Sequence, residues 1–253
     1  MNVLDRFRLD GRAAIVTGAS SGLGVAIASA LAEAGADVAI GARRVDRMKA
    51  TVELVEAAGR RAISVATDVS RPEDCEELAR RTVEEFGRID ILVNNAGIGT
   101  AVPATRESPE EFRSVIDVNL NGAYWMAQSA ARRMTNGGSI VNITSVLGFI
   151  TAGLPQSAYA ASKAGLDGLT RDLASQWTAR KGIRVNSLAA GFFPTEMTDQ
   201  YADGYLESRV ERTLAGRLGV PAELAAVVVF LASDASSYIT GATIPVDGGM
   251  VIA

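Results

Sequence analysis

The stretch Thr17-Gly18-Ala19-Ser20-Ser21-Gly22-Leu23-Gly24 follows a short apolar run, Ala13 to Thr17, and precedes an apolar helical pattern. Its glycines allow a tight turn and a close approach of the backbone to a pyrophosphate, and the helix that follows offers free N–H groups. The spacing Gly-x3-Gly-x-Gly is one residue longer than the usual dinucleotide fingerprint, and such a turn can also be purely structural. No Gly-Lys-Ser/Thr follows, so a P-loop is excluded. The stretch predicts a strand, a phosphate-binding turn and a helix.

The same order of a short apolar run and a longer helical pattern recurs along the chain. Strands are expected over residues 13–17, 37–41, 62–66, 89–93, 139–144, 183–188 and 242–246, with helices beginning near Gly22, Val45, Pro72, Pro109, Ser157 and Pro221. Regular alternation predicts a parallel sheet with helices on both faces, and the nearly continuous apolar character of the strands agrees with this. We therefore expect an α/β protein, a doubly wound Rossmann fold with seven parallel strands, as a single domain over residues 1–253.

Composition narrows the class of protein. With 48% hydrophobic residues the chain can bury a sizeable core. Its net charge of -4 and pI near 5.1 argue against a nucleic-acid binder, which usually carries a basic stripe. No apolar run reaches the roughly 18 residues of a membrane span, and the stretch from Met1 to Asp10 lacks the apolar core of a secretory signal. We expect a cytoplasmic protein that binds neither nucleic acid nor membrane.

The chain contains no histidine. This excludes Ser-His-Asp and Cys-His mechanisms and removes the commonest ligand of catalytic zinc, so we expect no metal site. An acid or base must be a carboxylate, a lysine, a tyrosine or Cys75, the one cysteine. Cys75 stands between Asp74 and Glu76 on a helix expected to be exposed, and the neighbouring carboxylates disfavour a reactive thiolate.

The end of the second strand indicates which dinucleotide binds. NAD-binding sites commonly place Asp or Glu there to accept from the ribose 2′-hydroxyl. Here Ile40-Gly41-Ala42 is followed by Arg43 and Arg44, whose guanidinium groups suit a 2′-phosphate. We expect NADP(H) rather than NAD(H). The alternative is that both arginines lie on a solvated face, or that Asp46 pairs with one of them.

The segment Tyr159-Ala160-Ala161-Ser162-Lys163 supplies an acid and base. Residues four apart on a helix project from one face. A free tyrosine, with a pKa near 10, is about three units too weak as a base at neutral pH. A neighbouring ammonium and an oxidised nicotinamide ring favour the phenolate and narrow this gap.

A strand upstream ends in two hydroxyl residues, Thr144 and Ser145. The carboxyl ends of strands in doubly wound sheets line the ligand crevice. Ser145 can donate a hydrogen bond to a carbonyl oxygen as negative charge develops on it. Thr144 is the competing candidate.

These motifs together resemble the short-chain dehydrogenase/reductase family. They are Gly18-x3-Gly22-x-Gly24, Asn94-Asn95-Ala96-Gly97, Asn119, Ser145 and Tyr159-x3-Lys163. The C-terminal Ile239-Thr240-Gly241 and Pro245-Val246-Asp247-Gly248-Gly249 also resemble it, so the resemblance runs from about Leu9 to Gly249, nearly the whole chain.

The resemblance implies four catalytic residues. Tyr159 protonates the carbonyl oxygen of the substrate, or deprotonates the alcohol in the reverse direction. Lys163 lowers the pKa of Tyr159 and holds the nicotinamide ribose, while Ser145 orients and polarises the substrate oxygen. Asn119 bends a helix and holds a water that relays protons through Lys163.

The resemblance also implies a long cofactor site. Asp68 accepts a hydrogen bond from the adenine amino group, and Asn95-Ala96-Gly97 packs beside the adenosine ribose. The stretch from Phe192 to Thr195 contacts the nicotinamide carboxamide. The implied cofactor-binding residues are Gly18, Ser20, Ser21, Gly22, Leu23, Gly24, Arg43, Arg44, Asp68, Val69, Asn95, Ala96, Gly97, Tyr159, Lys163, Phe193 and Thr195.

The chain departs from the family after the sixth strand, where Ala190-Gly191 replaces the usual Pro-Gly. Proline stiffens a loop, so we expect looser contacts to the carboxamide, with Pro194 partly restoring stiffness. The polar segment 192–219 then follows, with Tyr201 and Tyr205. Its position is typical of a lid over a site, and a helical excursion with only a packing role is the alternative.

A small-molecule carbonyl or alcohol is the expected substrate. The expected contacts are Ser145, Val146, Gln156, Tyr159 and Phe192, with Leu147 and the Tyr201–Tyr205 region nearby. The pattern resembles β-ketoacyl-carrier-protein reductases and gluconate or polyol dehydrogenases about equally. An acidic carrier protein would need a basic rim, which Arg132, Arg133, Arg180 and Lys181 offer.

Two other functions deserve comparison. A catalytically silent dinucleotide sensor is expected to have lost Tyr159 or Lys163, and both are present. Epimerase and dehydratase relatives generally carry a larger C-terminal substrate domain.

Family members of this length are usually homotetramers, and the apolar faces expected on helices 109–135 and 157–180 suit two-fold packing between copies.

Overall fold

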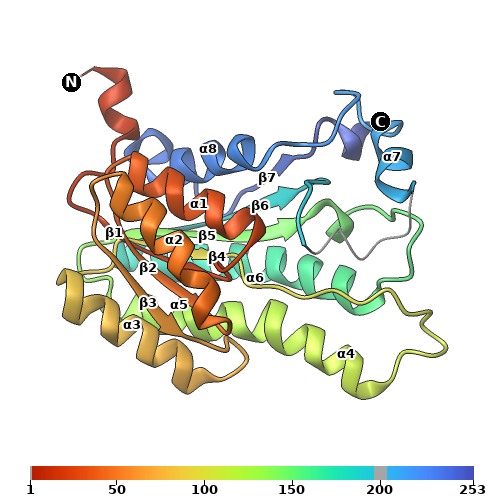
Figure 1. The fold of residues 1–253 in the computed structure, drawn as a ribbon, viewed down its shortest axis with the longest axis horizontal. Helices are drawn as coiled ribbons and strands as arrows, with labels where there is room; N and C mark the ends of the chain where they lie inside the picture. Colours follow the sequence, from red (N-terminus) through yellow and green to blue (C-terminus); the bar gives the residue numbers. More distant parts are fainter. Residues whose placement is uncertain (1, 197–203) are drawn as a thin grey trace.

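The structure, a computed structural model, describes residues 2–196 and 204–253. Its described residues form a seven-stranded, all-parallel sheet in the order β3-β2-β1-β4-β5-β6-β7 (Figure 1). The strands are β1 (Ala13–Thr17), β2 (Asp37–Ala42), β3 (Ala62–Ala66), β4 (Ile91–Asn94), β5 (Gly138–Ser145), β6 (Ile183–Ala190) and β7 (Thr243–Val246). The predicted doubly wound α/β fold is confirmed, with strand ends shifted by one or two residues.

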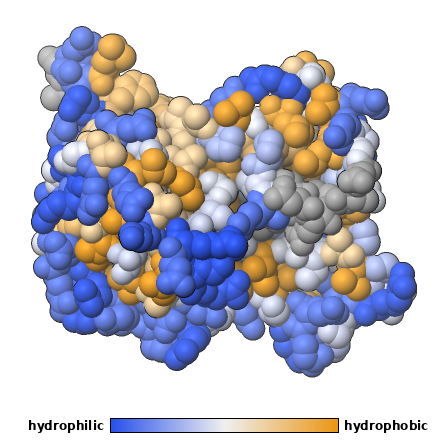
Figure 2. All heavy atoms as spheres, viewed as in Figure 1, coloured by the Kyte–Doolittle hydropathy of each residue, from blue (hydrophilic) through white to orange (hydrophobic). Residues whose placement is uncertain are grey.

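Helices cover both faces of this sheet. They are α1 (Gly22–Glu33), α2 (Val45–Ala57), α3 (Pro72–Phe86), α4 (Pro109–Ile116), α5 (Gly122–Arg133), α6 (Ser157–Lys181), α7 (Tyr205–Val210) and α8 (Pro221–Ala232). Helices α1, α2 and α8 lie on one face, and α3, α5 and α6 on the other (Figure 1). Among the described helices, none has both the length and the apolarity of a membrane span. The surface in Figure 2 mixes hydrophilic atoms with several separate hydrophobic areas.

The core is double because the side chains of each strand alternate between the two faces. Ala14 and Val16 of β1 pack with α1 and α8, whereas Ala13 and Ile15 pack with α3 and α5. All five residues of β1 are buried. This central strand therefore anchors the turn that follows it at Gly18.

Two expectations about exposure are corrected. The strands are not covered throughout, because β3 lies at the sheet edge and is partly exposed along its length. Cys75 does not lie on an exposed surface: it is fully buried, in the cluster where α3 packs on the sheet. Its charged neighbours indicated the wrong face, since adjacent helix residues point in different directions. Burial raises the pKa of the Cys75 thiol to about 12.

The long helix expected over 109–135 is interrupted in its middle. Helix α4 begins at the Ser108 cap, whose hydroxyl accepts from Glu111 N at 3.1 Å. A π-helical turn, Asp117–Asn121, then separates α4 from α5. Such turns insert one extra residue and re-aim the side chains that follow. Here the turn carries Asn119.

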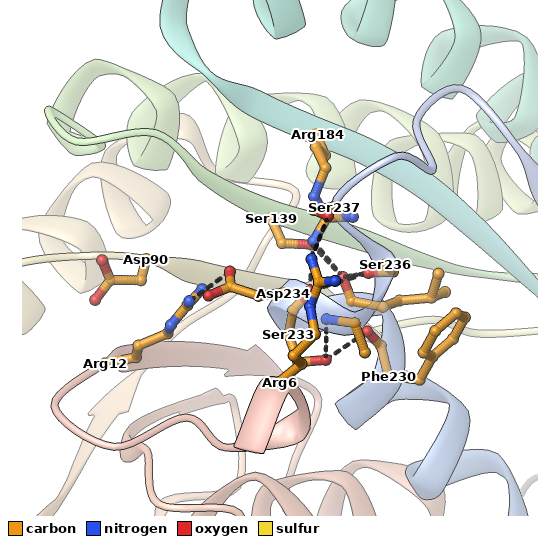
Figure 3. A network of polar contacts seen from close by, with 12 residues as sticks. Arg6, Arg12, Asp90, Ser139, Arg184, Phe230, Ser233, Asp234, Ser236 and Ser237 are labelled. Atoms are coloured by element: carbon orange, nitrogen blue, oxygen red, sulfur yellow. Dashed lines mark hydrogen bonds and ion pairs between the residues drawn. The ribbon is translucent and has the colours of Figure 1, made fainter. Parts of the chain in front are cut away.

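A network of polar contacts surrounds Arg184, near the beginning of β6 (Figure 3). The Arg184 guanidinium of β6 donates to Leu231 O at 2.8 Å, Ser233 O at 3.1 Å and Ile239 O at 3.1 Å. Burial lowers the pKa of Arg184. The bonds to Leu231 O and Ser233 O satisfy carbonyl groups at the end of α8 that the helix leaves unpaired. The network therefore ties β6 to the segment that follows α8, at the end of the strand away from its carboxyl end.

Candidate active site

A cleft of ≈ 270 Å³ opens at the carboxyl ends of β1, β2, β4, β5 and β6. It is lined by residues 18, 20–23, 41–44, 67–69, 95–98, 118, 143–147, 159, 163, 190–193, 195 and 196. Loops at this edge of a parallel sheet are where ligands bind in doubly wound folds. Of the predicted site residues, only Gly24, Asn119 and Gln156 lie outside this lining.

The glycine turn forms one wall of the cleft. Gly18 has φ +69°, and a Cβ there would lie 2.7 Å from Ala96 Cα. Gly24 lies beneath the turn, where a Cβ would lie 2.7 Å from Ala19 Cα. Asn95 Nδ2 donates to Thr17 O at 2.9 Å and to Gly18 O at 3.2 Å. The glycines are therefore required by close packing, and Asn95 holds the turn in place.

The arginine end of the cleft contains a carboxylate that the sequence did not reveal. Arg44 Nη2 donates to Ser21 Oγ at 2.7 Å and to Glu196 Oε2 at 2.9 Å, and Arg47 also pairs with Glu196. The hydrogen bond from Arg44 lowers the pKa of Glu196. Glu196, rather than Asp46, is thus the described carboxylate that pairs with Arg44. It is 152 residues away in sequence, so no local pattern could have predicted it.

Asp68 both lines the cleft and caps a turn. Its Oδ1 accepts from Ser70 N at 3.1 Å and Ser70 Oγ at 2.7 Å. Its own N–H donates to Asp74 Oδ2 at 2.9 Å. Asp68 can therefore stabilise the turn through Oδ1 and still offer Oδ2 to a ligand, because these bonds do not use Oδ2.

Tyr159, Lys163 and Ser145 meet at the other end of the cleft. Lys163 Nζ donates to Ile143 O at 2.9 Å and lies 5.6 Å from the centroid of the Tyr159 ring. Burial lowers the pKa of Lys163 to about 8, and the Asp167 carboxylate opposes this shift. Ser145 Oγ accepts from Leu147 N at 3.2 Å, so its hydroxyl proton can be donated elsewhere. The arrangement places a phenol, an ammonium and a hydroxyl around one space.

Thr144 and Ser145 point to opposite faces of β5, as successive strand residues do. The Thr144 hydroxyl is buried and lowers the pKa of Asp167. Ser145 is therefore the better placed of the two hydroxyls for a substrate in the cleft.

Asn119 lies behind the cleft in the π-helical turn. Its Oδ1 accepts from Ile98 N at 2.8 Å, and its Nδ2 donates to Ile98 O at 2.9 Å and to Ser162 Oγ at 3.1 Å. A Cβ on Gly97 would lie 3.3 Å from Asn119 Oδ1 and 3.5 Å from Lys163 Nζ. Asn119 thus fixes the loop that lies against Lys163.

The expected substrate side is mainly apolar. Val146, Leu147 and Phe192 line the cleft, and the Phe192 ring stacks edge-on against Tyr205 with centroids 6.0 Å apart. Gln156 is buried at the N-cap of α6. Tyr201 lies outside the described residues. Helix α7 forms within the segment 192–219, for which a helical excursion was the alternative to a lid.

Ala190 is part of β6 rather than of a loop. It pairs with Ser145 of β5 and Val246 of β7, and Gly191 N donates to Val246 O at 2.9 Å. An alanine can take a place in the strand ladder that a proline would disturb. The strand therefore runs up to the edge of the cleft.

Comparison with known proteins identifies the family. A family model described as enoyl-(acyl carrier protein) reductase matches residues 18–251. The 2-dehydro-3-deoxy-D-gluconate 5-dehydrogenase of Escherichia coli (strain K12) is 41% identical over 252 residues, which cover 98% of each chain. This chain belongs to the short-chain dehydrogenase/reductase family. It is an oxidoreductase of that family.

Two further members of the short-chain dehydrogenase/reductase family illustrate its range. The 3-oxoacyl-(acyl-carrier-protein) reductase of Thermotoga maritima is 39% identical over 247 residues, 97% of this chain and 100% of its own. The crystal structure of a gluconate 5-dehydrogenase from Burkholderia cenocepacia J2315, in complex with NADP and tartrate, matches at 37% identity with a TM-score of 0.93 and covers 100% of both chains. The relatives are named for different substrates.

Proposed function

We propose that this chain is an NADP(H)-dependent oxidoreductase that interconverts a ketone and a secondary alcohol, with Tyr159 as the general acid and base. The observation that carries the proposal is that one cleft contains the Arg44 guanidinium at one end and Tyr159 with Lys163 at the other. The NADP complex of the Burkholderia cenocepacia relative supports the choice of cofactor.

The cleft suits a dinucleotide on its own chemistry. The glycine turn leaves no room for side chains where a pyrophosphate would approach, and α1 begins at Gly22 with its first N–H groups at the cleft. When bound, NADP(H) supplies or accepts the hydride. Arg43 and Arg44 would hold the 2′-phosphate, and Lys163 the nicotinamide ribose.

Three side chains of this chain would then handle the proton. In reduction, Ser145 donates a hydrogen bond to the carbonyl oxygen, and Tyr159 transfers its proton to that oxygen as charge develops. The Lys163 ammonium stabilises the phenolate that results. In oxidation the same phenolate removes the alcohol proton. Asn119 supports this group indirectly, through the Ile98 loop.

Ser145→Ala is expected to lower kcat for ketone reduction by about 10²-fold, because one preorganised donor to the developing oxyanion is lost. KM for NADPH should change little. Steady-state kinetics measure both. Ser139→Ala is the matched control, because this serine lies on the same strand and its hydroxyl donates to Leu231 O at 2.7 Å, far from the cleft. An unchanged kcat in Ser145→Ala would assign the substrate oxygen to another donor.

Arg44→Gln is expected to raise KM for NADPH by about 10- to 100-fold, because a charge-assisted bond to the 2′-phosphate is lost. KM for NADH should stay nearly constant. Glu196→Gln should act in the opposite direction and lower KM for NADPH about threefold, since it removes an anion that competes for Arg44 at the surface. Arg71→Gln removes an exposed arginine paired with Glu73 and is the control. A wild-type preference for NADH would overturn the cofactor assignment.

A panel of carbonyl compounds with NADPH tests the activity and its substrate class. The arms are simple ketones, keto sugar acids and β-ketoacyl thioesters, free and carrier-bound. Loss of nicotinamide absorbance with any arm supports the proposal. Reduction only of carrier-bound thioesters would favour the alternative, a β-ketoacyl-carrier-protein reductase. Tight NADPH binding with no turnover in any arm would favour the silent sensor instead.

Four further expectations stay predictions. They are the single domain over residues 1–253, the lid over 192–219, the homotetramer and the cytoplasmic location. The lid prediction gains support from Glu196, which ties the start of that segment to Arg44 and Arg47 at the cleft.

A further inference from the structure

A buried carboxyl group lies one helical turn beyond Lys163 on α6. Asp167 is 3% exposed and Lys163 is 4% exposed. Because residues four apart share one face of a helix, Tyr159, Lys163 and Asp167 follow one another in a row along α6. Tyr159 and Lys163 line the cleft and Asp167 does not, so the carboxyl stands behind the ammonium as seen from the cleft.

Hydroxyl groups from three strands surround this carboxyl. Thr243 Oγ1 of β7 donates to Asp167 Oδ1 at 3.2 Å. Ser187 of β6 and Thr144 of β5 also interact with the carboxyl. Thr144 Oγ1 and Asp167 Oδ2 nevertheless lack a hydrogen bond of good geometry, although both atoms are buried. Hydrogen bonds therefore satisfy the Asp167 carboxyl only in part. A buried carboxylate with an unsatisfied oxygen is stabilised by a cation nearby.

Two cations flank Asp167 along α6, Lys163 four residues before it and Arg171 four residues after it. Burial raises the pKa of Asp167, and the three hydroxyls and Arg171 oppose that shift. Burial lowers the pKa of Lys163 to about 8, and the Asp167 carboxylate opposes that shift in turn. An ammonium buried without a carboxylate loses its proton more readily still.

We propose that Asp167 is a positioning residue that keeps the Lys163 side chain protonated and so sets the alkaline limit of the pH range in which Tyr159 exchanges its proton. The role rests on the proposed function of Tyr159, because Lys163 stabilises the phenolate only while it carries its charge. Asp167 itself contacts neither substrate nor cofactor in this proposal.

The test is the dependence of kcat on pH for Asp167→Asn. The substitution keeps the shape of the side chain and removes its charge, so Lys163 should release its proton at lower pH. The alkaline limb of the profile should move down by about one pH unit, which lowers kcat about tenfold on that limb. KM for NADPH should stay within about twofold, because Asp167 does not line the cleft. A purely structural role would lower the unfolding temperature without moving the limb.

Three matched variants sharpen the result. Asp172→Asn removes the same charge from an exposed position of α6, where the carboxylate pairs with Gln176, and should leave the profile unchanged. Asp167→Glu restores a carboxylate and should return the limb toward its wild-type position. Asp167→Val removes the charge with an apolar side chain and gives a second charge-free variant in case Asp167→Asn does not fold.

The outcomes separate this role from the proposed function. The positioning role is supported if the alkaline limb of the kcat profile shifts in a charge-free variant and returns in Asp167→Glu. A folded charge-free variant with the wild-type profile overturns it, and leaves Tyr159 untouched if Tyr159→Phe is inactive. Failure of both charge-free variants to fold, while Asp167→Glu folds, would show a structural requirement and would also overturn it. Activity retained in Tyr159→Phe would instead overturn the proposed function.

Discussion

Tyr159→Phe is expected to lower kcat for ketone reduction by about 10³- to 10⁴-fold, because the variant cannot supply the proton that the carbonyl oxygen requires. The aromatic ring remains, so packing in the apolar cluster around Val146 and Phe192 should be preserved. KM for NADPH should change little. Steady-state kinetics and the unfolding temperature together measure these effects.

Tyr124→Phe is the matched control for this variant. Its hydroxyl accepts from Gln128 Nε2 at 3.4 Å on α5, away from the cleft lining, and its loss should leave kcat unchanged. Substantial turnover in Tyr159→Phe would show that the proton comes from another group. With no histidine in the chain, the other described acid groups that line the cleft and could supply it are Lys163, Asp68 and Glu196.

Lys163→Met is expected to lower kcat by about 10²- to 10³-fold and to raise KM for NADPH. The buried ammonium is lost, so the phenolate of Tyr159 loses the positive charge one helical turn away, which is worth about one to three pKa units. The wild-type enzyme should itself lose activity as the pH rises through about 8, the pKa of Lys163, because the ammonium is then neutralised. The variant should lack that alkaline limb. Full pH profiles of kcat measure both effects.

Lys181→Met controls for the loss of a lysine from α6. Lys181 Nζ donates to Ala131 O at 3.2 Å, a bond of the same kind as that of Lys163 to Ile143 O, but at the far end of the helix. Its loss should affect stability only. If Lys163→Met retained the wild-type profile, the ammonium would have no part in setting the proton affinity of Tyr159.

The fold could be predicted because its signals are local. Apolar strands, glycine turns and helix starts alternate over short distances along the chain. Each of these patterns predicts the secondary structure of the residues that carry it. The placement of Tyr159 and Lys163 together in the cleft was predictable for the same reason, since a spacing of four puts both side chains on one helix face. Ser145 needed only the position of a strand end.

The features that escaped prediction depend on contacts between distant segments. Glu196 meets Arg44 across 152 residues, and Asp167 meets Thr243 across 76. Cys75 was placed on the wrong face because flanking charges do not report which side of a helix packs on the sheet. Asn119, by contrast, was expected to bend a helix and lies in a π-helical turn, where its side chain bonds to Ile98, and its part in the catalytic group stays a prediction.

The central claim is that a hydride passes between nicotinamide and a substrate carbonyl in this cleft. The most direct measurement uses NADPH carrying deuterium at the transferable position of C4, with the best ketone of the panel, and locates the label in the product by mass spectrometry and NMR. The account predicts a single deuterium on the former carbonyl carbon of the alcohol. Consumption of NADPH with no deuterium on that carbon would contradict it.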